Sequence, residues 1–107
     1  MSNILSAPVT EFAFITLKQE KESERGDLEQ LLDELRREIS SAKGFHGFSW
    51  GKSVDPGKEN LYILVLGWDS AEAHWAAVGP DTTCGKLIEN KLRVLSNIDL
   101  SHAAINH

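Results

Sequence analysis

The sequence predicts an α+β fold with the ferredoxin-like β-α-β-β-α-β order, in which a four-stranded antiparallel sheet carries both helical regions on one face. Three observations support this prediction. Segments rich in aromatic and β-branched residues alternate with segments of helical spacing, the middle two strands flank a short turn-forming loop, and the third strand is apolar almost throughout. The 107 residues suit a single domain, with a core from about residue 8 to residue 105.

The first strand is predicted over residues 8–18, PVTEFAFITLK, and a helix follows the charged segment after it. Asp27 is expected to cap that helix, with Gln30 completing a capping box. Gly44 is expected to end the segment in a left-handed conformation. The buried face of the helix is predicted from apolar residues at helical spacing, namely Leu28, Leu31, Leu32, Leu35 and Ile39.

The second and third strands are predicted over residues 45–54 and 61–68, joined by the loop DPGKEN with Pro56 and Gly57 as turn residues. Glycines in the second strand indicate a bulge or a close backbone approach. The third strand, LYILVLGW, is nearly continuous in apolar residues, which is typical of a central strand that is buried on both faces.

Asp69 is expected to cap a short helix with the help of Glu72, and the segment VGP ends that helix. A further helix is predicted over residues 82–95 and a last strand over residues 96–105. The apolar face of this helix comprises Cys84, Leu87, Ile88 and Leu95, and one face of the strand comprises Ile98, Leu100, His102 and Ala104.

The predicted order of elements leaves the second face of the sheet without a covering layer. Two helical regions cover one face, yet Phe12 and Phe14 lie opposite Ala13 and Ile15 on the first strand. Exposed apolar surface of this extent usually marks an interface. We therefore predict a homodimer packed sheet to sheet.

Charge and cysteine content narrow the class of protein. The net charge of −5, with 11 scattered basic residues, argues against a nucleic-acid partner. The single cysteine, Cys84, excludes an internal disulfide and a cysteine-rich zinc site, and it is expected to be a plain buried thiol. The start shows no signal-peptide pattern, and no apolar run approaches the ~20 residues that span a bilayer. We expect a cytoplasmic protein with no membrane partner.

Three titratable residues are candidates for catalysis. Glu11 lies on an apolar face of the first strand, where burial would raise the pKa of its carboxyl and suit it to proton transfer; the alternative is a frayed strand end that lets it reach water. Tyr62 could orient a phenolic or carbonyl ligand, or be a core tyrosine. His74, on the short helix, could act as a general base, or be a solvent-side or structural histidine.

Three further residues are expected to contact a ligand: Trp68, Trp50 and His102. For Trp68 the alternative is packing at the end of a buried strand. His74 and Trp75 project about 100° apart around the helix, so we expect one of them to face outward. No HxH or HxxxH spacing occurs, so no metal site is predicted.

The segment WGKSVDPGKENLYILVLGWDSAEAHW, residues 50–75, resembles the dimeric α+β barrel superfamily. That superfamily includes antibiotic-biosynthesis monooxygenase-type (ABM-like) domains and stress-responsive A/B barrel proteins. The likeness depends on the hairpin start WGKSV and the strand-to-helix junction GWDSAEAH, and the topology extends it over residues 8–105. The resemblance implies a homodimer with a pocket in each subunit between the sheet and the helices.

Three branches of the superfamily differ in the residues they need. The olivetolic acid cyclase-like branch needs a basic histidine near Thr82 and a tyrosine near Ala76 or Ala77, and neither residue type is kept. The haem-degrading branch has a tryptophan that corresponds to Trp68 but needs an axial histidine, which TTCGKLIENKLRVL lacks. The quinone-forming monooxygenase branch needs no cofactor, because the substrate supplies much of the reactivity.

We therefore predict a cofactor-independent enzyme, monooxygenase- or cyclase-like, that acts on an aromatic or polyketide-type small molecule.

The alternative is a non-catalytic stress-responsive or ligand-binding dimer. An interaction module that docks a basic partner on the acidic segment 20–38 is a third possibility, although such a face is usually just solvated.

Overall fold

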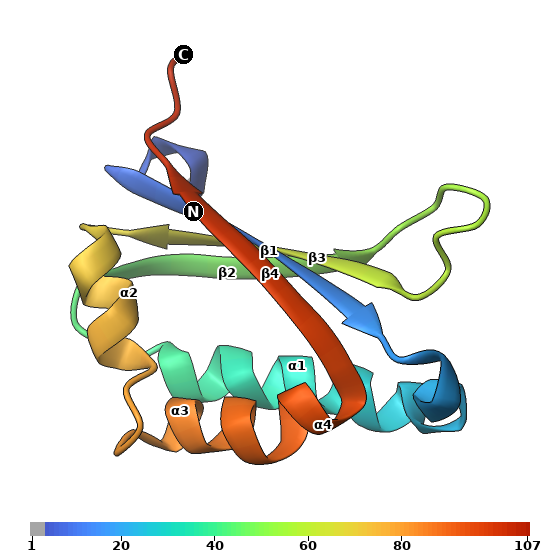
Figure 1. Ribbon diagram of the computed structural model, residues 1–107. Helices are drawn as coiled ribbons and strands as arrows, with labels where there is room; N and C mark the ends of the chain where they lie inside the picture. The colour runs from blue at the N-terminus through green and yellow to red at the C-terminus, as the bar shows by residue number, and fades with distance from the viewer. Residues whose placement is uncertain (1–3) are drawn as a thin grey trace.

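The strands form one antiparallel sheet in the computed structural model, which describes residues 4–107. Their order across the sheet is β2-β3-β1-β4 (Figure 1). The strands are β1 (Val9–Leu17), β2 (Phe45–Lys52), β3 (Leu61–Trp68) and β4 (Ser96–Ala103). The predicted ferredoxin-like topology is confirmed, and the first and third strands of the chain lie at the centre of the sheet.

Helix α1 (Arg25–Ile39) lies under the sheet, and its five predicted apolar residues are all buried (Figure 1). The predicted cap at Asp27 is wrong, because a 3-10 helix (Gln19–Glu24) leads directly into α1. The N-cap position is Glu24, and its side chain makes no capping bond. Asp27 lies instead in the first turn of α1, where a negative charge still favours the helix dipole.

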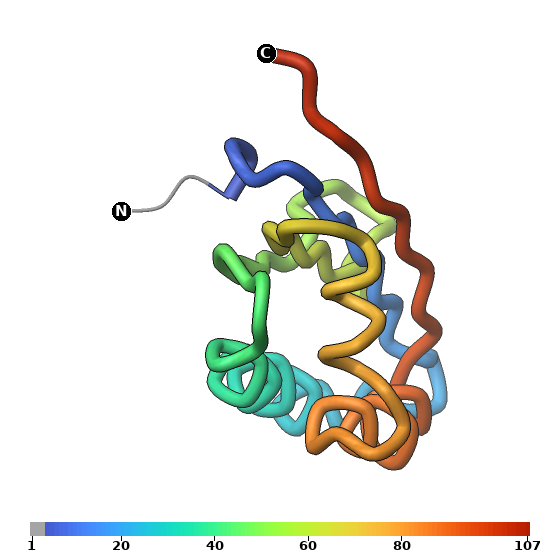
Figure 2. The backbone as a smooth tube through the Cα atoms, turned by 90° about the vertical axis from the view of Figure 1, so that its left-hand side faces the viewer, coloured from blue at the N-terminus to red at the C-terminus, as the bar shows by residue number. Residues whose placement is uncertain are grey.

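Helix α2 (Ala71–Ala77) closes one end of the space between the sheet and the other helices (Figure 2). The predicted cap at Asp69 is wrong by one residue: Ser70 is extended, and its side chain accepts a hydrogen bond from the Ala73 backbone N–H at 3.1 Å. The Asp69 carboxylate pairs instead with His46 of β2. The predicted end of the helix before Gly79 is confirmed.

The last helical region is continuous but not uniform. It runs through α3 (Thr83–Leu87), a π-helical turn η3 (Ile88–Leu92) and α4 (Arg93–Leu95). The Thr82 side chain caps it by accepting a hydrogen bond from the Gly85 N–H at 2.9 Å. Because the π turn is wider than an α turn, residues beyond it change face. Leu92, the last residue of the π turn, is buried as well, although the predicted apolar face did not include it.

The two faces of the sheet differ in cover. Toward the helices, alternate residues of β3 are buried, and they form the core together with α1; they are Tyr62, Leu64, Leu66 and Trp68. On the opposite face, Ile63 and Val65 are only partly buried, and Phe14 of β1 is 39% exposed. We expected β3 to be buried on both faces. Within a single chain, only its helix-facing side is fully buried.

The connections follow the sequence signals. Gly44 has a φ of 81°, as expected for a left-handed residue after a helix, and β2 has a register shift between Phe45 and Gly47, as expected for a bulge. Within residues 4–107, no helix combines the length and the apolar character needed to cross a membrane.

Candidate active site

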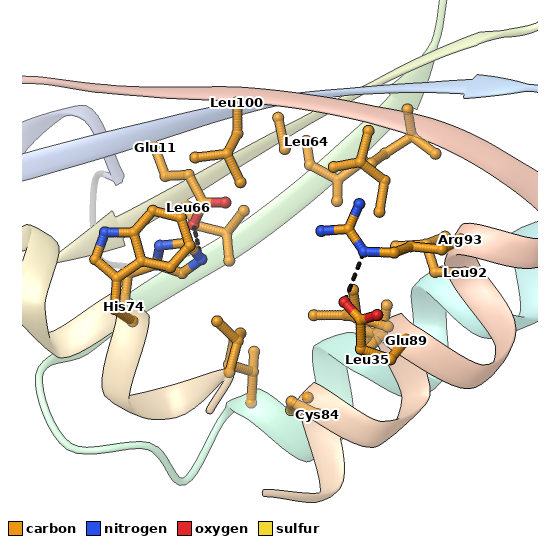
Figure 3. A pocket seen from close by; sticks show the side chains of 18 of the residues that line it. Glu11, Leu35, Leu64, Leu66, His74, Cys84, Glu89, Leu92, Arg93 and Leu100 are labelled. Atoms are coloured by element: carbon orange, nitrogen blue, oxygen red, sulfur yellow. Dashed lines mark hydrogen bonds and ion pairs between the residues drawn. The ribbon is translucent and has the colours of Figure 1, made fainter. Parts of the chain in front are cut away.

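A cavity of about 320 Å³ lies between the helix-facing side of the sheet and the helices (Figure 3). Its wall is mainly aliphatic, and it includes Ala13, Ile15, Leu64, Leu66, Leu92 and Leu100. A volume near 300 Å³ is at the small end of ligand pockets, and an apolar wall with a few polar groups is typical of a small-molecule site. The polar groups therefore decide what chemistry this cavity supports.

Glu11 of β1 projects into this cavity and is 4% exposed (Figure 3). Its Oε1 atom accepts a hydrogen bond from Trp68 Nε1 at 2.9 Å. Burial raises the pKa of the carboxyl to about 7, although the Trp68 hydrogen bond lowers it somewhat. Of the two alternatives for Glu11, the structure therefore shows the buried one: a carboxyl that can hold or release a proton near neutral pH.

His74 of α2 is the second polar group of the cavity, and it is also 4% exposed. Its Nε2 atom lies 3.4 Å from Glu11 Oε1, and its Nδ1 atom lies 2.9 Å from Nε2 of His102. Burial lowers the pKa of His74 to about 4, and the neighbouring His102 adds to this effect. His74 is therefore neutral at physiological pH. The helical spacing predicted that one of His74 and Trp75 faces outward, but Trp75, although 54% exposed, also lines the cavity, and its ring centroid lies 4.6 Å from that of His74.

The sheet brings His102 to this group. Glu11 and His102 are register partners on the neighbouring strands β1 and β4, so their side chains leave the sheet side by side. His102 is only partly buried and does not line the cavity itself. It contacts His74 instead, with the two ring centroids 4.8 Å apart.

Arg93 and Glu89 lie on the far side of the cavity from Glu11 (Figure 3). Arg93 Nε donates a hydrogen bond to Glu89 Oε1 at 2.7 Å, and both side chains are about half exposed or more, at 52% and 63%. Sequence reasoning missed this pair. Their i, i+4 spacing was the available signal, but such a pair on a helix usually lies on a solvated face, and here the π turn aims it at the cavity.

Tyr62 is not brought to this site. It is fully buried on the correct face of β3, but it does not line the cavity. Its hydroxyl donates to Glu29 Oε2 at 2.6 Å and accepts from Arg25 at 2.9 Å, which ties β3 to α1. The structure thus supports the alternative in which Tyr62 is a core tyrosine with a hydrogen-bonded hydroxyl.

The two predicted tryptophan contacts also lie outside the cavity wall. Trp68 is fully buried and packs edge-on against Phe45, while its Nε1 atom holds Glu11. Trp50 donates to Asp33 Oδ1 at 3.0 Å, and its ring lies tilted against that of Tyr62, with the centroids 5.8 Å apart. Trp68 therefore serves the site by orienting Glu11, and Trp50 joins β2 to α1.

Three potential metal-ligating side chains converge here, although the sequence spacing predicted no metal site. One donor atom from each of Glu11, His74 and His102 lies within 4.8 Å of the others. However, the two facing imidazole nitrogens are only 2.9 Å apart and are hydrogen-bonded to each other. An ion would have to break that bond and turn a ring, so in this arrangement the two imidazoles bond to each other while His74 Nε2 faces Glu11 Oε1 at 3.4 Å.

Solved structures with the same fold are similar over nearly the whole chain. SnoaB, a cofactor-independent oxygenase from Streptomyces nogalater, has a TM-score of 0.76 and 16% identity, with 92% of this chain and 93% of that chain covered. PA3566 from Pseudomonas aeruginosa has a TM-score of 0.74 and 17% identity, with 98% and 100% covered. Rv0793 from Mycobacterium tuberculosis has a TM-score of 0.71 and 16% identity, with 94% and 97% covered.

At these identities the solved structures establish the fold and not the activity. No curated protein matches the sequence. The family model described as antibiotic biosynthesis monooxygenase matches residues 8–79, which is more than half of the chain and includes β1, α1, the central hairpin and α2. The matched segment also contains two of the cavity's polar groups, Glu11 and His74. The chain therefore belongs to the antibiotic biosynthesis monooxygenase (ABM) family.

Proposed function

We propose that this protein is a cofactor-independent oxygenase that acts on an aromatic, phenol- or anthrone-like small molecule held in the cavity. The observation that carries the proposal is the carboxyl of Glu11, which is 4% exposed in an aliphatic cavity, where burial raises its pKa to about 7. A general base is most effective when its pKa is close to the working pH. The similar fold of SnoaB, a cofactor-independent oxygenase, is consistent with this proposal.

In the proposed reaction, the Glu11 carboxylate removes a proton from an acidic C–H or O–H group of the substrate. The resulting electron-rich anion reacts with molecular oxygen, so that a ring CH₂ and O₂ become a ring C=O and water. The aromatic substrate supplies the electrons, and the protein supplies a dry cavity and a base. Neutral His74 lies beside the carboxylate, with its Nε2 atom 3.4 Å from Glu11 Oε1.

Arg93 would bind the oxygen substituents of the substrate. Its guanidinium lies at the opposite side of the cavity from Glu11 and uses Nε to hold Glu89 (Figure 3). The remaining guanidinium N–H groups can donate to a carbonyl or a phenolate oxygen. A planar ligand that reaches from Arg93 to Glu11 would then present its acidic group to the base.

We also propose that the working unit is a homodimer packed through the outer face of the sheet. Phe14 is exposed there, and the partly buried Phe12, Ile63 and Val65 surround it on β1 and β3. Most residues with outward side chains on β4 are polar, namely Asn97, Asp99 and Ser101, so the large apolar side chains are confined to the middle of the sheet. A second copy would cover this area and leave the cavity, on the other face, accessible.

The test is oxygen consumption with a panel of anthrones, naphthols and linear polyketides. We expect turnover by the unmodified protein without added metal or flavin, and a loss of roughly a hundredfold or more in Glu11→Gln, because general-base catalysis contributes about 10²–10⁴-fold. Glu72→Gln is the matched control, since Glu72 is an exposed carboxylate on α2. Ligand binding without product formation would instead support the non-catalytic binding dimer.

A further inference from the structure

Four polar side chains form a chain that leads from the cavity to the surface. Trp68 Nε1 donates to Glu11 Oε1 at 2.9 Å, Glu11 Oε1 lies 3.4 Å from His74 Nε2, and His74 Nδ1 lies 2.9 Å from His102 Nε2. Exposure increases along this chain. Trp68, Glu11 and His74 are buried, whereas His102, on the last strand, is only partly buried.

The two ends of the chain differ in what they can do with a proton. The indole of Trp68 is a donor only and does not titrate near neutral pH, so no proton can leave Glu11 through it. On the other side, neutral His74 carries one N–H and one acceptor nitrogen, and each nitrogen faces a different partner. His74 can therefore accept a proton at one nitrogen while it releases another at the opposite nitrogen.

We propose that His74 and His102 form a proton relay that carries the proton collected by Glu11 out of the cavity to solvent. This role rests on the proposed function of Glu11 as the base. The relay makes His102 a functional residue although it does not line the cavity.

The proton balance of the relay is complete. After Glu11 has taken a proton from the substrate, its carboxyl O–H points to His74 Nε2, and His74 Nδ1–H points to His102 Nε2. His102 loses its Nδ1 proton to water and takes up the proton of His74 Nδ1 at Nε2. His74 in turn takes up the Glu11 proton at Nε2. One proton has left for solvent and Glu11 is ionised again. Each imidazole now holds the opposite tautomer, so both must return to the starting tautomer before the next turnover.

The surroundings of Glu11 explain why such a route is needed. A bound ligand would fill the apolar side of the cavity and exclude water from the carboxyl. Among the described residues, the other titratable groups that line the cavity are Cys84, Glu89 and Arg93, and none of them forms a hydrogen bond or an ion pair with Glu11. Without the two histidines, the protonated carboxyl would have to wait for product release before it could ionise.

A first test needs no substrate. In the unmodified protein, long-range ¹⁵N–¹H NMR should show His74 protonated at Nε2 when Glu11 is ionised and at Nδ1 when Glu11 is protonated. In Glu11→Gln this exchange of tautomer should vanish. A His74 that keeps one tautomer across the Glu11 titration would overturn the relay, and this result does not depend on any variant folding.

A second test uses turnover. His102→Phe keeps the ring contacts but removes both nitrogens, and we expect kcat to fall at least tenfold with KM unchanged, with partial rescue by free imidazole. His46→Phe is the matched control, because His46 also pairs with a carboxylate, that of Asp69, but lies away from the cavity. Unchanged kcat in His102→Phe would overturn the relay and leave the proposed oxygenase intact.

Two more outcomes separate the alternatives. Coupled tautomers with no turnover on any substrate of the panel would overturn the proposed function and still support the chain as a path for protons. Titration with Co²⁺ tests whether Glu11, His74 and His102 bind a metal ion together. Visible d–d absorption bands that disappear in both Glu11→Gln and His102→Phe would show a metal site and overturn the relay.

Discussion

His74 Nε2 lies 3.4 Å from Glu11 Oε1, and both side chains are almost completely buried. Burial acts on the two groups in opposite directions, because it disfavours the charged form of each. It raises the pKa of Glu11 to about 7 and lowers the pKa of His74 to about 4. Between these pH values both groups are neutral, so their 3.4 Å contact is not an ion pair.

This opposition predicts two pH effects on stability that cancel each other. The unfolded chain ionises Glu11 above 4.5, whereas the folded chain does so only at about 7, so this residue's contribution to stability falls as the pH rises through that interval. The unfolded chain protonates His74 below 6.5, whereas the folded chain resists until about 4, so the contribution of His74 falls as the pH falls. We expect the unmodified protein to change little in stability between pH 5 and 6.5.

Single substitutions should uncover each effect. Going from pH 6.5 to pH 5, Glu11→Gln should lose about 1–2 kcal/mol of unfolding free energy relative to the unmodified protein, and His74→Gln should gain a similar amount, at ~1.4 kcal/mol per pH unit. Urea unfolding at the two pH values measures both changes. Slopes of the same sign in the two variants would contradict the opposed titration of the pair.

The outer face of the sheet predicts how the proposed dimer can be separated into monomers. Phe14 is 39% exposed at the centre of the proposed interface, so Phe14→Glu would bury a charge there and should convert the dimer to monomers. Val54 is 96% exposed in the hairpin loop, and Val54→Glu is the matched control that should remain dimeric. Light scattering with size-exclusion chromatography measures this; a monomeric unmodified protein would rule out the interface.

The fold was predictable because its signals are local. The alternation in β1, the helical spacing of the leucines in α1 and the loop around Gly57 each depend on a few neighbouring residues, and all three predictions are confirmed. The caps at Asp27 and Asp69 were wrong because several adjacent polar residues can cap a helix, and the backbone conformation chooses among them.

The site was predictable only in part, because its residues meet through long-range register. Glu11 stood out as a carboxylate on an apolar face, but its neighbour His102 depends on the pairing of the first and last strands. Arg93 depends on the π turn, which has no clear sequence signal. Tyr62 had the correct face but lies along β3 beside α1, where Glu29 and Arg25 hold its hydroxyl.

Cys84 offers a chemical probe of the cavity. Its thiol lines the cavity wall and is 5% exposed, and burial, helped by the charge of Glu38, raises its pKa. Little thiolate is therefore present at pH 8, and we expect reaction with a disulfide reagent to be at least tenfold slower than in urea. A cavity ligand should slow the reaction further; a rate that equals the unfolded rate would show an open cavity.

The loop between α2 and α3 packs so closely against Gly85 that adding a single methyl group there should destabilise the protein. A Cβ atom on Gly85 would lie 2.0 Å from the Gly79 carbonyl oxygen and 2.7 Å from that of Val78. The Gly79 oxygen already accepts hydrogen bonds from the backbone and the side chain of Thr82, at 3.0 Å and 2.7 Å. Gly85→Ala must therefore displace the loop between α2 and α3 and break these bonds.

We expect Gly85→Ala to lower the unfolding free energy by about 1–3 kcal/mol, as overpacking in a core does, and to weaken ligand binding because Val78, Gly79 and Gly85 all line the cavity. Gly26→Ala is the matched control: Gly26 is exposed in α1 and a Cβ there meets nothing within 4 Å, so the substitution should stabilise by about 0.5–1 kcal/mol. Urea unfolding and ligand titration of the two variants measure both effects. Equal unfolding free energies in the two variants would mean that the α2–α3 loop can move without a loss of stability. A loop that moves so readily could not exclude water from Glu11.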